Sequence, residues 1–261
     1  AKVAVRFGIS RQRVYQILAR YDAGGEAAIA PKSRAPHSSP QAVPEALRRE
    51  IIQIRTNLTR NGFDAGLDTI AFHLTQAGLR TPSTSTIRRI ITQAGLVVPA
   101  PQKKPKSSYI RFQAALANEC WQADITHAFV AGGQRIEILD FLDDHSRFLL
   151  SITASTAFSG TDVAAELTRL IECYGPPAST LTDNGLVFTA RLAGRRGGRN
   201  AFEKVLTANR IQQKNGRPGH PQTQGKIERF HQTLKKWLAA RPPAATVGEL
   251  QPLLDEFRDY Y

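Results

Sequence analysis

Three isolated carboxylates constrain the fold of this chain more than any other feature of its sequence. Asp124 interrupts a neutral, strand-like run at 121–127, Asp183 directly follows a short apolar strand, and Glu228 lies within an amphipathic helical pattern. A carboxylate on a half-buried strand is costly unless a partner or a metal ion compensates its charge. We therefore expect the fold to bring the three groups, from two strands and a helix, to one compensated site.

The apolar periodicity from about residue 117 onward predicts alternating strands and helices. Tight connections near 132–133 and 143–146 favour antiparallel pairing of the first three strands. Strands are expected at 121–130, 135–142, 147–154 and 178–182, with a short one around Ile211, and helices at 160–173, 201–209, 222–240 and 246–260. Three hairpin-linked strands, a helical crossover and a further strand predict an α/β fold, a ribonuclease-H-like mixed sheet flanked by helices.

Side-chain periodicity assigns faces to two of the carboxylates. Period-2 alternation in the first strand puts Asp124 on the face opposite the apolar residues Trp121, Ala123 and Ile125. The buried stripe of the last long helix is expected to comprise Ile227, Phe230, Leu234 and Trp237. Glu228 falls beside that stripe, at the edge of the core face, from where it can approach the strand ends.

Three carboxylates gathered in this way form a ligand set for hard divalent cations. Mg²⁺ prefers the oxygens of carboxylates, phosphates and water. Two such ions can activate an attacking water or 3′-hydroxyl and stabilise the leaving oxygen of a phosphodiester. The second half of the chain therefore indicates an enzyme that cuts or joins nucleic acid.

The charge distribution indicates the same class of partner. The formal net charge is +13 over 261 residues. Residues 1–106 contain 17 Lys and Arg against 6 Asp and Glu, a net of +11, whereas residues 107–261 contain 18 against 16, a net of +2. So basic a front half favours a polyanionic partner.

Residues 1–30 have the spacing of a helix-turn-helix unit. Small and apolar residues recur at Ala4, Gly8, Val14 and Ile17, and Ser10 is placed to cap the second helix. The exposed side chains that can reach phosphates and base edges are Arg11, Gln12, Arg13 and Gln16. A generic two-helix turn is the alternative. A helix-turn-helix normally packs on at least one more helix, so a preceding segment is expected.

The rest of the chain divides into linkers, a second helical unit and the core. The expected boundaries are 31–44 for a proline-rich linker, 45–98 for a second helical DNA-binding unit, 99–114 for a basic linker, 115–240 for the core and 241–261 for a terminal helix. In the helical unit at 45–98, Ser83 is expected to begin a helix that carries Arg88 and Arg89, which are either DNA contacts or solvated charges. In the basic linker, Lys103, Lys104 and Lys106 are expected to follow a DNA backbone.

Other patterns exclude competing classes. Cys120 and Cys173 are the only cysteines and lack the spacing of a zinc finger, which favours a reducing, cytoplasmic compartment. No apolar run reaches membrane-spanning length, so no membrane partner is expected. A P-loop is excluded because five residues instead of four separate Gly219 from Gly225, and Ile227 stands where Ser or Thr is needed.

Four motifs, in order, resemble the integrase core of DDE-type insertion-sequence transposases, which belong to the same superfamily as retroviral integrases. They are Trp121-Gln122-Ala123-Asp124, Asp143-Asp144-His145-Ser146-Arg147, Thr182-Asp183-Asn184-Gly185 and the run from Gly219 to His231. The similarity covers about 115–240. One departure is the spacing from Asp183 to Glu228, 45 positions, which is wider than usual; the surplus is expected at 193–200, as a DNA-contacting loop or a bland insertion.

The resemblance implies a site, a cofactor and partners. Asp124, Asp183 and Glu228 are the implied catalytic and metal-binding triad, and the implied supporting residues are Asn184, Gly185 and Gln224. The implied cofactor is Mg²⁺, with Mn²⁺ as a substitute and two ions expected. The implied reactions are nicking at element ends and transfer of the 3′-hydroxyl into target DNA, by a homodimer or larger assembly on double-stranded DNA in the bacterial cytosol.

Several alternatives stay open from the sequence. The chain could be a non-catalytic DNA-binding protein derived from a transposase, or a plain nuclease without strand transfer. Lys226 and Arg229 either bind a phosphate or are solvated helix charges, and His127 and His231 either assist proton transfer or are structural. Three further acids near the site could replace Asp124, namely Asp140, Asp143 and Asp144, although the last two also suit a turn.

Overall fold

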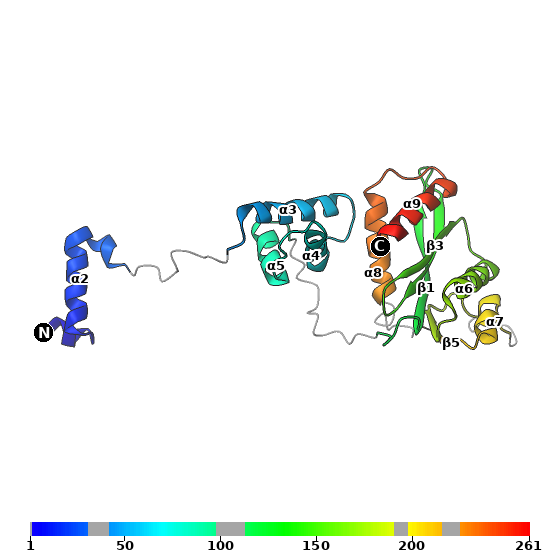
Figure 1. The fold of residues 1–261 in the computed structure, drawn as a ribbon, viewed down its shortest axis with the longest axis horizontal. Coiled ribbons are helices and arrows are strands. Elements are labelled where there is room, and N and C mark those ends of the chain that lie inside the picture. Colours follow the sequence, from blue (N-terminus) through cyan, green and yellow to red (C-terminus); the bar gives the residue numbers. More distant parts are fainter. Residues whose placement is uncertain (1, 31–41, 98–112, 191–197, 216–224) are drawn as a thin grey trace. The chain divides into compact units, whose positions relative to one another are not determined.

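The structure is a computed structural model. It describes residues 2–30, 42–97, 113–190, 198–215 and 225–261. The chain forms two compact units, Ala1–Pro44 and Glu45–Tyr261, which are described separately (Figure 1). The second unit contains both the second helical region and the α/β core. Within the described ranges, no helix combines the length and apolar character needed to cross a bilayer.

The first unit is a short helical pair. Its elements are α1 (Lys2–Arg6), α2 (Arg11–Gly24) and the 3-10 helix η1 (Glu26–Ile29). Gly8 has a φ of 63°, which suits the turn between the helices. The Ser10 hydroxyl accepts a hydrogen bond from the Arg13 amide at 3.1 Å, which confirms the predicted cap. Ala4 is buried, while Val14 and Ile17 are half-buried.

The second unit begins with three helices. They are α3 (Glu45–Arg60), α4 (Leu67–Gln76) and α5 (Thr84–Gln93). Their buried side chains are Ile51, Leu58, Ile70, Leu74, Ile87, Ile90 and Ile91. Ser83 caps α5 through the Thr86 amide, as predicted. Since α5 buries its isoleucines, Arg88 and Arg89 are left on its exposed face.

The core is a five-stranded mixed sheet. Its strands are β1 (Cys120–Phe129), β2 (Arg135–Asp143), β3 (Leu149–Ser155), β4 (Ser179–Thr182) and β5 (Gln212–Asn215). The spatial order is β3-β2-β1-β4-β5, with β1, β2 and β3 antiparallel and β4 parallel to both β1 and β5. This confirms the predicted fold class.

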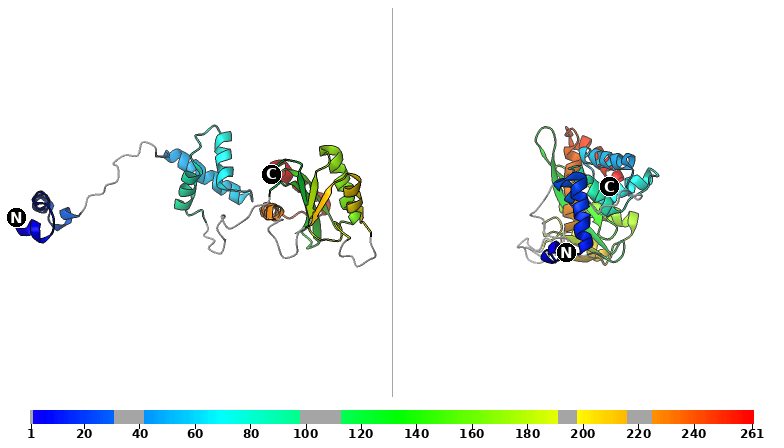
Figure 2. Two further views of the ribbon diagram at one scale, coloured as in Figure 1. Left: turned by 90° about the horizontal axis from the view of Figure 1, so that it is seen from below. Right: turned by 90° about the vertical axis from the view of Figure 1, so that its left-hand side faces the viewer.

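Helices cover both faces of the sheet. They are α6 (Gly160–Tyr174) and α7 (Ala201–Ala208) on one face, and α8 (Gly225–Ala239) and α9 (Val247–Tyr260) on the other (Figures 1 and 2). Trp121, Ala123 and Phe141 pack in the cluster that includes Val163 of α6. The opposite cluster joins the other face of β2 to α8 and α9, and it contains the predicted stripe Ile227, Phe230, Leu234 and Trp237.

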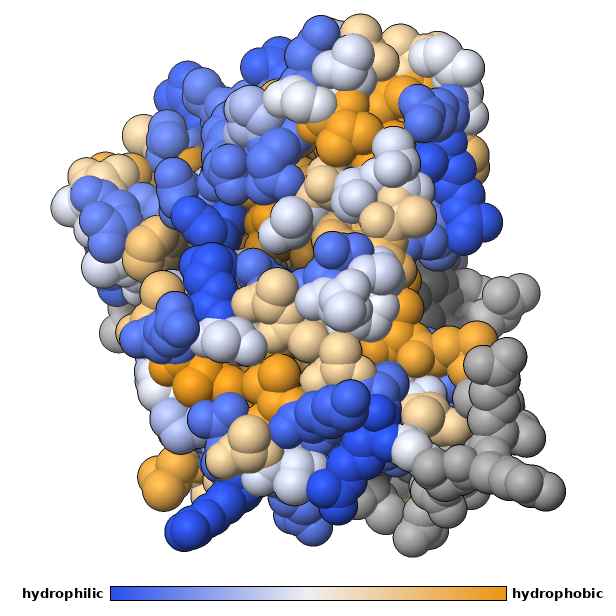
Figure 3. All heavy atoms as spheres, turned by 90° about the vertical axis from the view of Figure 1, so that its right-hand side faces the viewer, coloured by the Kyte–Doolittle hydropathy of each residue, from blue (hydrophilic) through white to orange (hydrophobic). Residues whose placement is uncertain are grey.

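The outer surface of the α6 and α7 side is mixed in character. Apolar side chains reach that surface in small patches between hydrophilic ones (Figure 3).

The two cysteines differ in exposure. Cys173 of α6 is exposed, whereas Cys120 of β1 is buried. Burial raises the pKa of the Cys120 thiol.

Candidate active site

The parallel pairing of β1 with β4 places two of the predicted carboxylates at neighbouring positions. Ala123 of β1 is the register partner of Thr182, the last residue of β4. Asp124 is the next residue of β1, and Asp183 directly follows β4. Since the two strands run in the same direction, the two acids lie at the same level along the sheet, on neighbouring strands. Asp124 retains 21% of its side-chain exposure.

Asp183 is held in a tight turn directly after β4. One of its carboxylate oxygens, Oδ1, accepts a hydrogen bond from the Gly185 amide at 2.8 Å. A Cβ at position 185 would lie 3.0 Å from that same oxygen, so a glycine there leaves room for the carboxylate. The Asn215 side chain of β5 donates to the Asp183 carbonyl at 3.2 Å. The turn thus holds the carboxylate, and β5 holds the backbone of Asp183.

Glu228 comes from the helix layer that covers the Asp124 face of the sheet. It lies in the first turn of α8 and is exposed. Burial raises the pKa of Asp124, the charge of His231 and a backbone hydrogen bond from Ile125 lower it, and the charges of Asp183 and Glu228 raise it further. The charges of Asp183 and Glu228 therefore both act on Asp124.

The chemistry of this cluster suits a divalent cation. Three carboxylates supply oxygen donors, and their mutual repulsion is a cost that a bound cation would offset. Among the described residues, no three His, Cys, Asp or Glu side chains are already gathered closely enough to hold a metal ion. Because Glu228 is exposed, its side chain can change rotamer without disturbing the core. By the chemistry of its oxygen donors, the set fits Mg²⁺ or Mn²⁺.

A buried carboxylate–imidazole pair lies behind Asp124. Asp140 of β2 is the register partner of Asp124, so the two side chains share a face of the sheet. His231 Nε2 is 2.7 Å from Asp140 Oδ2, and His231 Nδ1 is 3.9 Å from Asp124 Oδ2. The imidazole thus stands between the two acids.

Both members of that pair have raised pKa values. Burial raises the pKa of Asp140 to about 6, although the hydrogen bond and the charge of His231 act to lower it. Burial lowers the pKa of His231, but the hydrogen bond and charge of Asp140, together with the charge of Asp124, outweigh it and raise the pKa. Of the two predicted histidines, His231 is thus beside the carboxylates, whereas His127 lies 2.6 Å from the guanidinium of Arg135.

A second buried acid connects β1 to α8. Asp144 is fully buried and forms an ion pair with Lys226 at 2.5 Å. Its other carboxylate oxygen accepts a hydrogen bond from the Gln122 side chain at 2.6 Å. Asp143, in contrast, accepts from the backbone and hydroxyl of Ser146, as a turn aspartate does. Asp140 and Asp144 therefore have distinct partners, which the sequence pattern did not reveal because both contacts join residues more than 80 positions apart.

The residues predicted to contact DNA lie on several elements. Arg11, Gln12 and Arg13 are exposed on α2, and Arg88 and Arg89 are exposed on α5. Arg229 is exposed and lies 3.4 Å from Asp64, whereas the Lys226 amine is held by Asp144. Lys103, Lys104 and Gln224 lie outside the described residues, as does most of the 193–200 loop.

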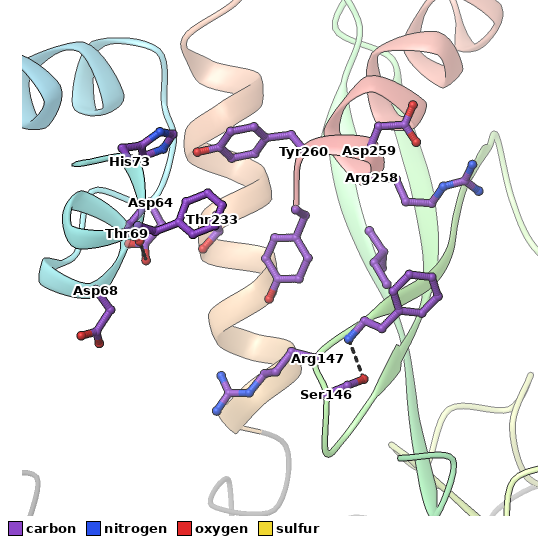
Figure 4. Close-up of a pocket in the computed structure, with 14 residues that line it drawn as sticks. Asp64, Asp68, Thr69, His73, Ser146, Arg147, Thr233, Arg258, Asp259 and Tyr260 are labelled. Carbon is purple, nitrogen blue, oxygen red and sulfur yellow. Dashed lines mark hydrogen bonds between the residues drawn. The ribbon is translucent and has the colours of Figure 1, made fainter. Parts of the chain in front are cut away.

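A pocket of about 870 Å³ occurs elsewhere in the second unit. Figure 4 shows its lining side chains from α4, from the β2–β3 connection and from the end of α9, among them Asp68, His73, Arg147 and Tyr260. None of the three predicted carboxylates lines it. The candidate site is thus defined by its charged groups and not by this cavity.

Comparisons with known proteins match the architecture. Two models of the integrase core domain family match residues 114–221 and 209–261, and a homeodomain-like domain matches residues 13–91. The chain is 30% identical over 148 residues to a 31.7 kDa protein of insertion element IS407 from Burkholderia multivorans, which covers 56% of this chain and 50% of that protein. It is 34% identical over 128 residues to the Gag-Pro-Pol polyprotein of squirrel monkey retrovirus, which covers 48% of this chain and 6% of the polyprotein.

The comparison with solved structures gave a match at low identity. The HTLV-2 integrase catalytic core domain in complex with magnesium is 20% identical, with a TM-score of 0.39, and the match covers 49% of this chain and 73% of that chain. This chain spans half the length of the insertion-element relative and a small part of the polyprotein. The two adjoining core matches, on a mixed sheet of the predicted class, make the chain a member of the integrase core domain family, with a homeodomain-like helical region before the core.

Proposed function

We propose that this chain catalyses metal-dependent nicking of DNA and transfer of the freed 3′-hydroxyl, the reactions of transposition of an insertion element. The observation that carries the proposal is the placement of Asp124 and Asp183 after paired positions of two parallel strands, with the charge of Glu228 acting on Asp124. The match to an insertion-element protein supports the biological setting.

In this proposal Asp124, Asp183 and Glu228 hold two Mg²⁺ ions, or Mn²⁺ in their place. Bound ions of this kind supply activation of a hydroxyl nucleophile and stabilisation of the leaving oxygen. The turn at Gly185 and the carbonyl contact of Asn215 hold Asp183 in place.

The proposed partner is double-stranded DNA, both element ends and target. The exposed basic residues of α2 and α5 are the proposed contacts, because phosphate binding by Arg and Lys supplies most of the affinity for a duplex. Transposition joins two ends of the element, and we propose that each end is bound by its own copy of the chain. At least two copies are then present on the DNA. The mass of the complex on DNA in solution tests this stoichiometry.

The decisive experiment is a strand-transfer assay with DNA that carries the ends of the element, in Mg²⁺ or Mn²⁺. The change is Asp124→Asn, which removes a charged ligand while keeping the shape of the side chain. We expect nicking and joining to fall by at least about 10³-fold, because several kcal/mol of charge stabilisation are lost. DNA affinity should stay within about twofold, since DNA contacts are assigned to other residues.

The matched control is Asp259→Asn, an exposed acid of α9. It should nick and join like the wild type. Cleavage that survives in Asp124→Asn would remove the site assignment. Nicking without joining would favour a plain nuclease, and DNA binding without metal-dependent cleavage would favour a non-catalytic DNA-binding protein.

A further inference from the structure

We infer that Asp144, Lys226 and Gln122 form a positioning ring that sets the place of Glu228 relative to Asp124. The inference deepens the proposed function and rests on it, because it concerns how the metal-binding group is assembled. The three ring residues are positioning residues and do not touch the reacting atoms.

Asp144 is the centre of the ring. Its carboxylate is fully buried, and each oxygen has a side-chain partner: Oδ1 accepts from Gln122 Nε2 at 2.6 Å and Oδ2 accepts from Lys226 Nζ at 2.5 Å. The Lys226 amine also donates to the Asp144 carbonyl at 2.7 Å, and the lysine side chain is only 12% exposed. The amine is therefore committed to this acid and not to solvent.

The ring closes through the start of α8. The Ile227 amide donates to Gln122 Oε1 at 3.3 Å. The first amides of a helix have no partner within the helix, so a side chain from elsewhere that accepts from one of them fixes the helix end. Gln122 thus joins β1 to the first turn of α8, and Lys226 joins the same turn to Asp144.

The spacing within the chain links the ring to the carboxylates. Gln122 lies two residues before Asp124, on the same face of β1. Lys226 lies two residues before Glu228, in the same helical turn. Glu228 is exposed and is the one member of the carboxylate group that comes from another layer. Its position is therefore set by the backbone of the turn that the ring holds.

Stability alone is a poor explanation for this arrangement. A buried ion pair often adds little stability, because its desolvation penalty offsets the attraction, and apolar replacements can be equally stable. The same physics permits a clean test, since a variant without both charges can fold while lacking the ring. The double variant is Asp144→Asn/Lys226→Met, and the milder single variant is Gln122→Leu.

The primary measurement is calorimetric binding of Mn²⁺ to the full chain without DNA. We expect the affinity of the double variant to fall by about 10- to 100-fold, as is typical when a residue that orients a metal ligand is lost. Hydrogen exchange of the amides in the first turn of α8 should accelerate in both variants. The urea midpoint should stay near that of the wild type, and so should DNA affinity. The control is Lys236→Met, an exposed lysine of the same helix, which should change none of these readouts.

The outcomes separate the two proposals. Unchanged Mn²⁺ affinity in a folded double variant, with or without faster exchange, overturns the positioning role and leaves a structural ring. If the double variant unfolds, the same two measurements on Gln122→Leu decide. If the wild type neither binds Mn²⁺ nor cleaves, the proposed function fails, and protected exchange at the Ile227 amide that is lost in Gln122→Leu still establishes the ring as the device that holds this turn.

Discussion

At the scale of single residues, the site shows how a sheet can accommodate several acids on one face. Asp124 and Asp140 are register partners, and His231 from α8 lies between them. One oxygen of Asp140, Oδ1, is buried without a hydrogen-bond partner in the described structure. Asp140 and His231 are therefore joined by the single 2.7 Å contact between Asp140 Oδ2 and His231 Nε2. The protonation of these two groups should affect the free energy of unfolding.

The pH dependence of folding follows from these two groups. The folded state holds protons more tightly than the unfolded state on both Asp140, with its pKa near 6, and His231. Since the folded state binds more protons, stability falls as pH rises from about 4 through the raised pKa values. In metal-free buffer we expect a loss on the order of 1–3 kcal/mol between about pH 5 and pH 8 from this pair.

Urea unfolding across that pH range measures the effect. The double variant Asp140→Asn/His231→Gln removes both titrating groups, so its stability should change less with pH than that of the wild type. An equally steep fall in the double variant would show that other groups are responsible.

The sequence predicted the identities of Asp124, Asp183 and Glu228 as site residues because each stands out from its local apolar pattern, and their catalytic role stays a prediction. It did not predict that Asp140 pairs with His231 or that Asp144 pairs with Lys226. The two contacts join residues 82 and 91 positions apart and depend on how α8 packs on the sheet. Local periodicity contains no information on such partners.

At the scale of elements, the edge strand β3 is completed by a side chain. β3 is the last strand in the sheet order, so one side of its backbone has no neighbouring strand in the described sheet. Gln251 of α9 accepts from the Ala154 amide at 2.8 Å and donates to the Ile152 carbonyl at 3.0 Å. The Gln251 side chain thus satisfies two backbone groups on the open side of β3. This protects part of an edge that is otherwise available to pair with another chain.

Removing that side chain tests its contribution. In Gln251→Ala two hydrogen bonds to the β3 backbone are lost, each contributing about 0.5–1.5 kcal/mol, so we expect a loss of about 1–3 kcal/mol in the free energy of unfolding. Urea denaturation measures it. Gln232→Ala, an exposed glutamine of α8, is the matched control and should stay within about 0.5 kcal/mol of the wild type. Equal effects in the two variants would mean that the edge contact contributes nothing.

Most elements followed from apolar periodicity, and the differences have physical causes. In the helical unit predicted at 45–98, the first helix, α3, continues to Arg60, and Leu58 adds a buried position near its end. The strand expected around Ile211 is β5, Gln212–Asn215, whose residues are all polar. Ile211 packs into the core, but backbone pairing begins after it, so the apolar signal marked the approach to the strand and not its length.

At the scale of the whole molecule, charge is divided between regions with different tasks. The front 106 residues carry a net charge of +11, and the remainder carries +2. In the core, several basic groups are already paired internally, among them Lys226 with Asp144 and Arg169 with Glu166 at 2.7 Å. Basic residues of the front half are therefore expected to dominate contact with phosphates.

The salt dependence of DNA binding tests this division. In Arg88→Ala/Arg89→Ala the slope of log affinity against log salt should become shallower by about 1–2, because about one counterion per phosphate contact is no longer released. Fluorescence anisotropy at several salt concentrations measures the slope. Arg169→Ala in the core should leave this slope unchanged. If the slope became as shallow in that control as in Arg88→Ala/Arg89→Ala, the assignment of DNA contacts to the front half would be contradicted.

The parallel pairing of β4 with β1 also has a kinetic consequence. The hairpins from β1 to β3 form between neighbouring stretches of chain. Asp183 lies 183 − 124 = 59 positions after Asp124 and reaches it only once the crossover through α6, between Ser155 and Ser179, has closed. The entropy of closing such a loop is lost before its contacts are gained, so this pairing is expected late in folding. A partly folded chain that already has its hairpins then lacks the paired carboxylates. If the proposed function holds, such a chain binds DNA before it gains the ability to cut it.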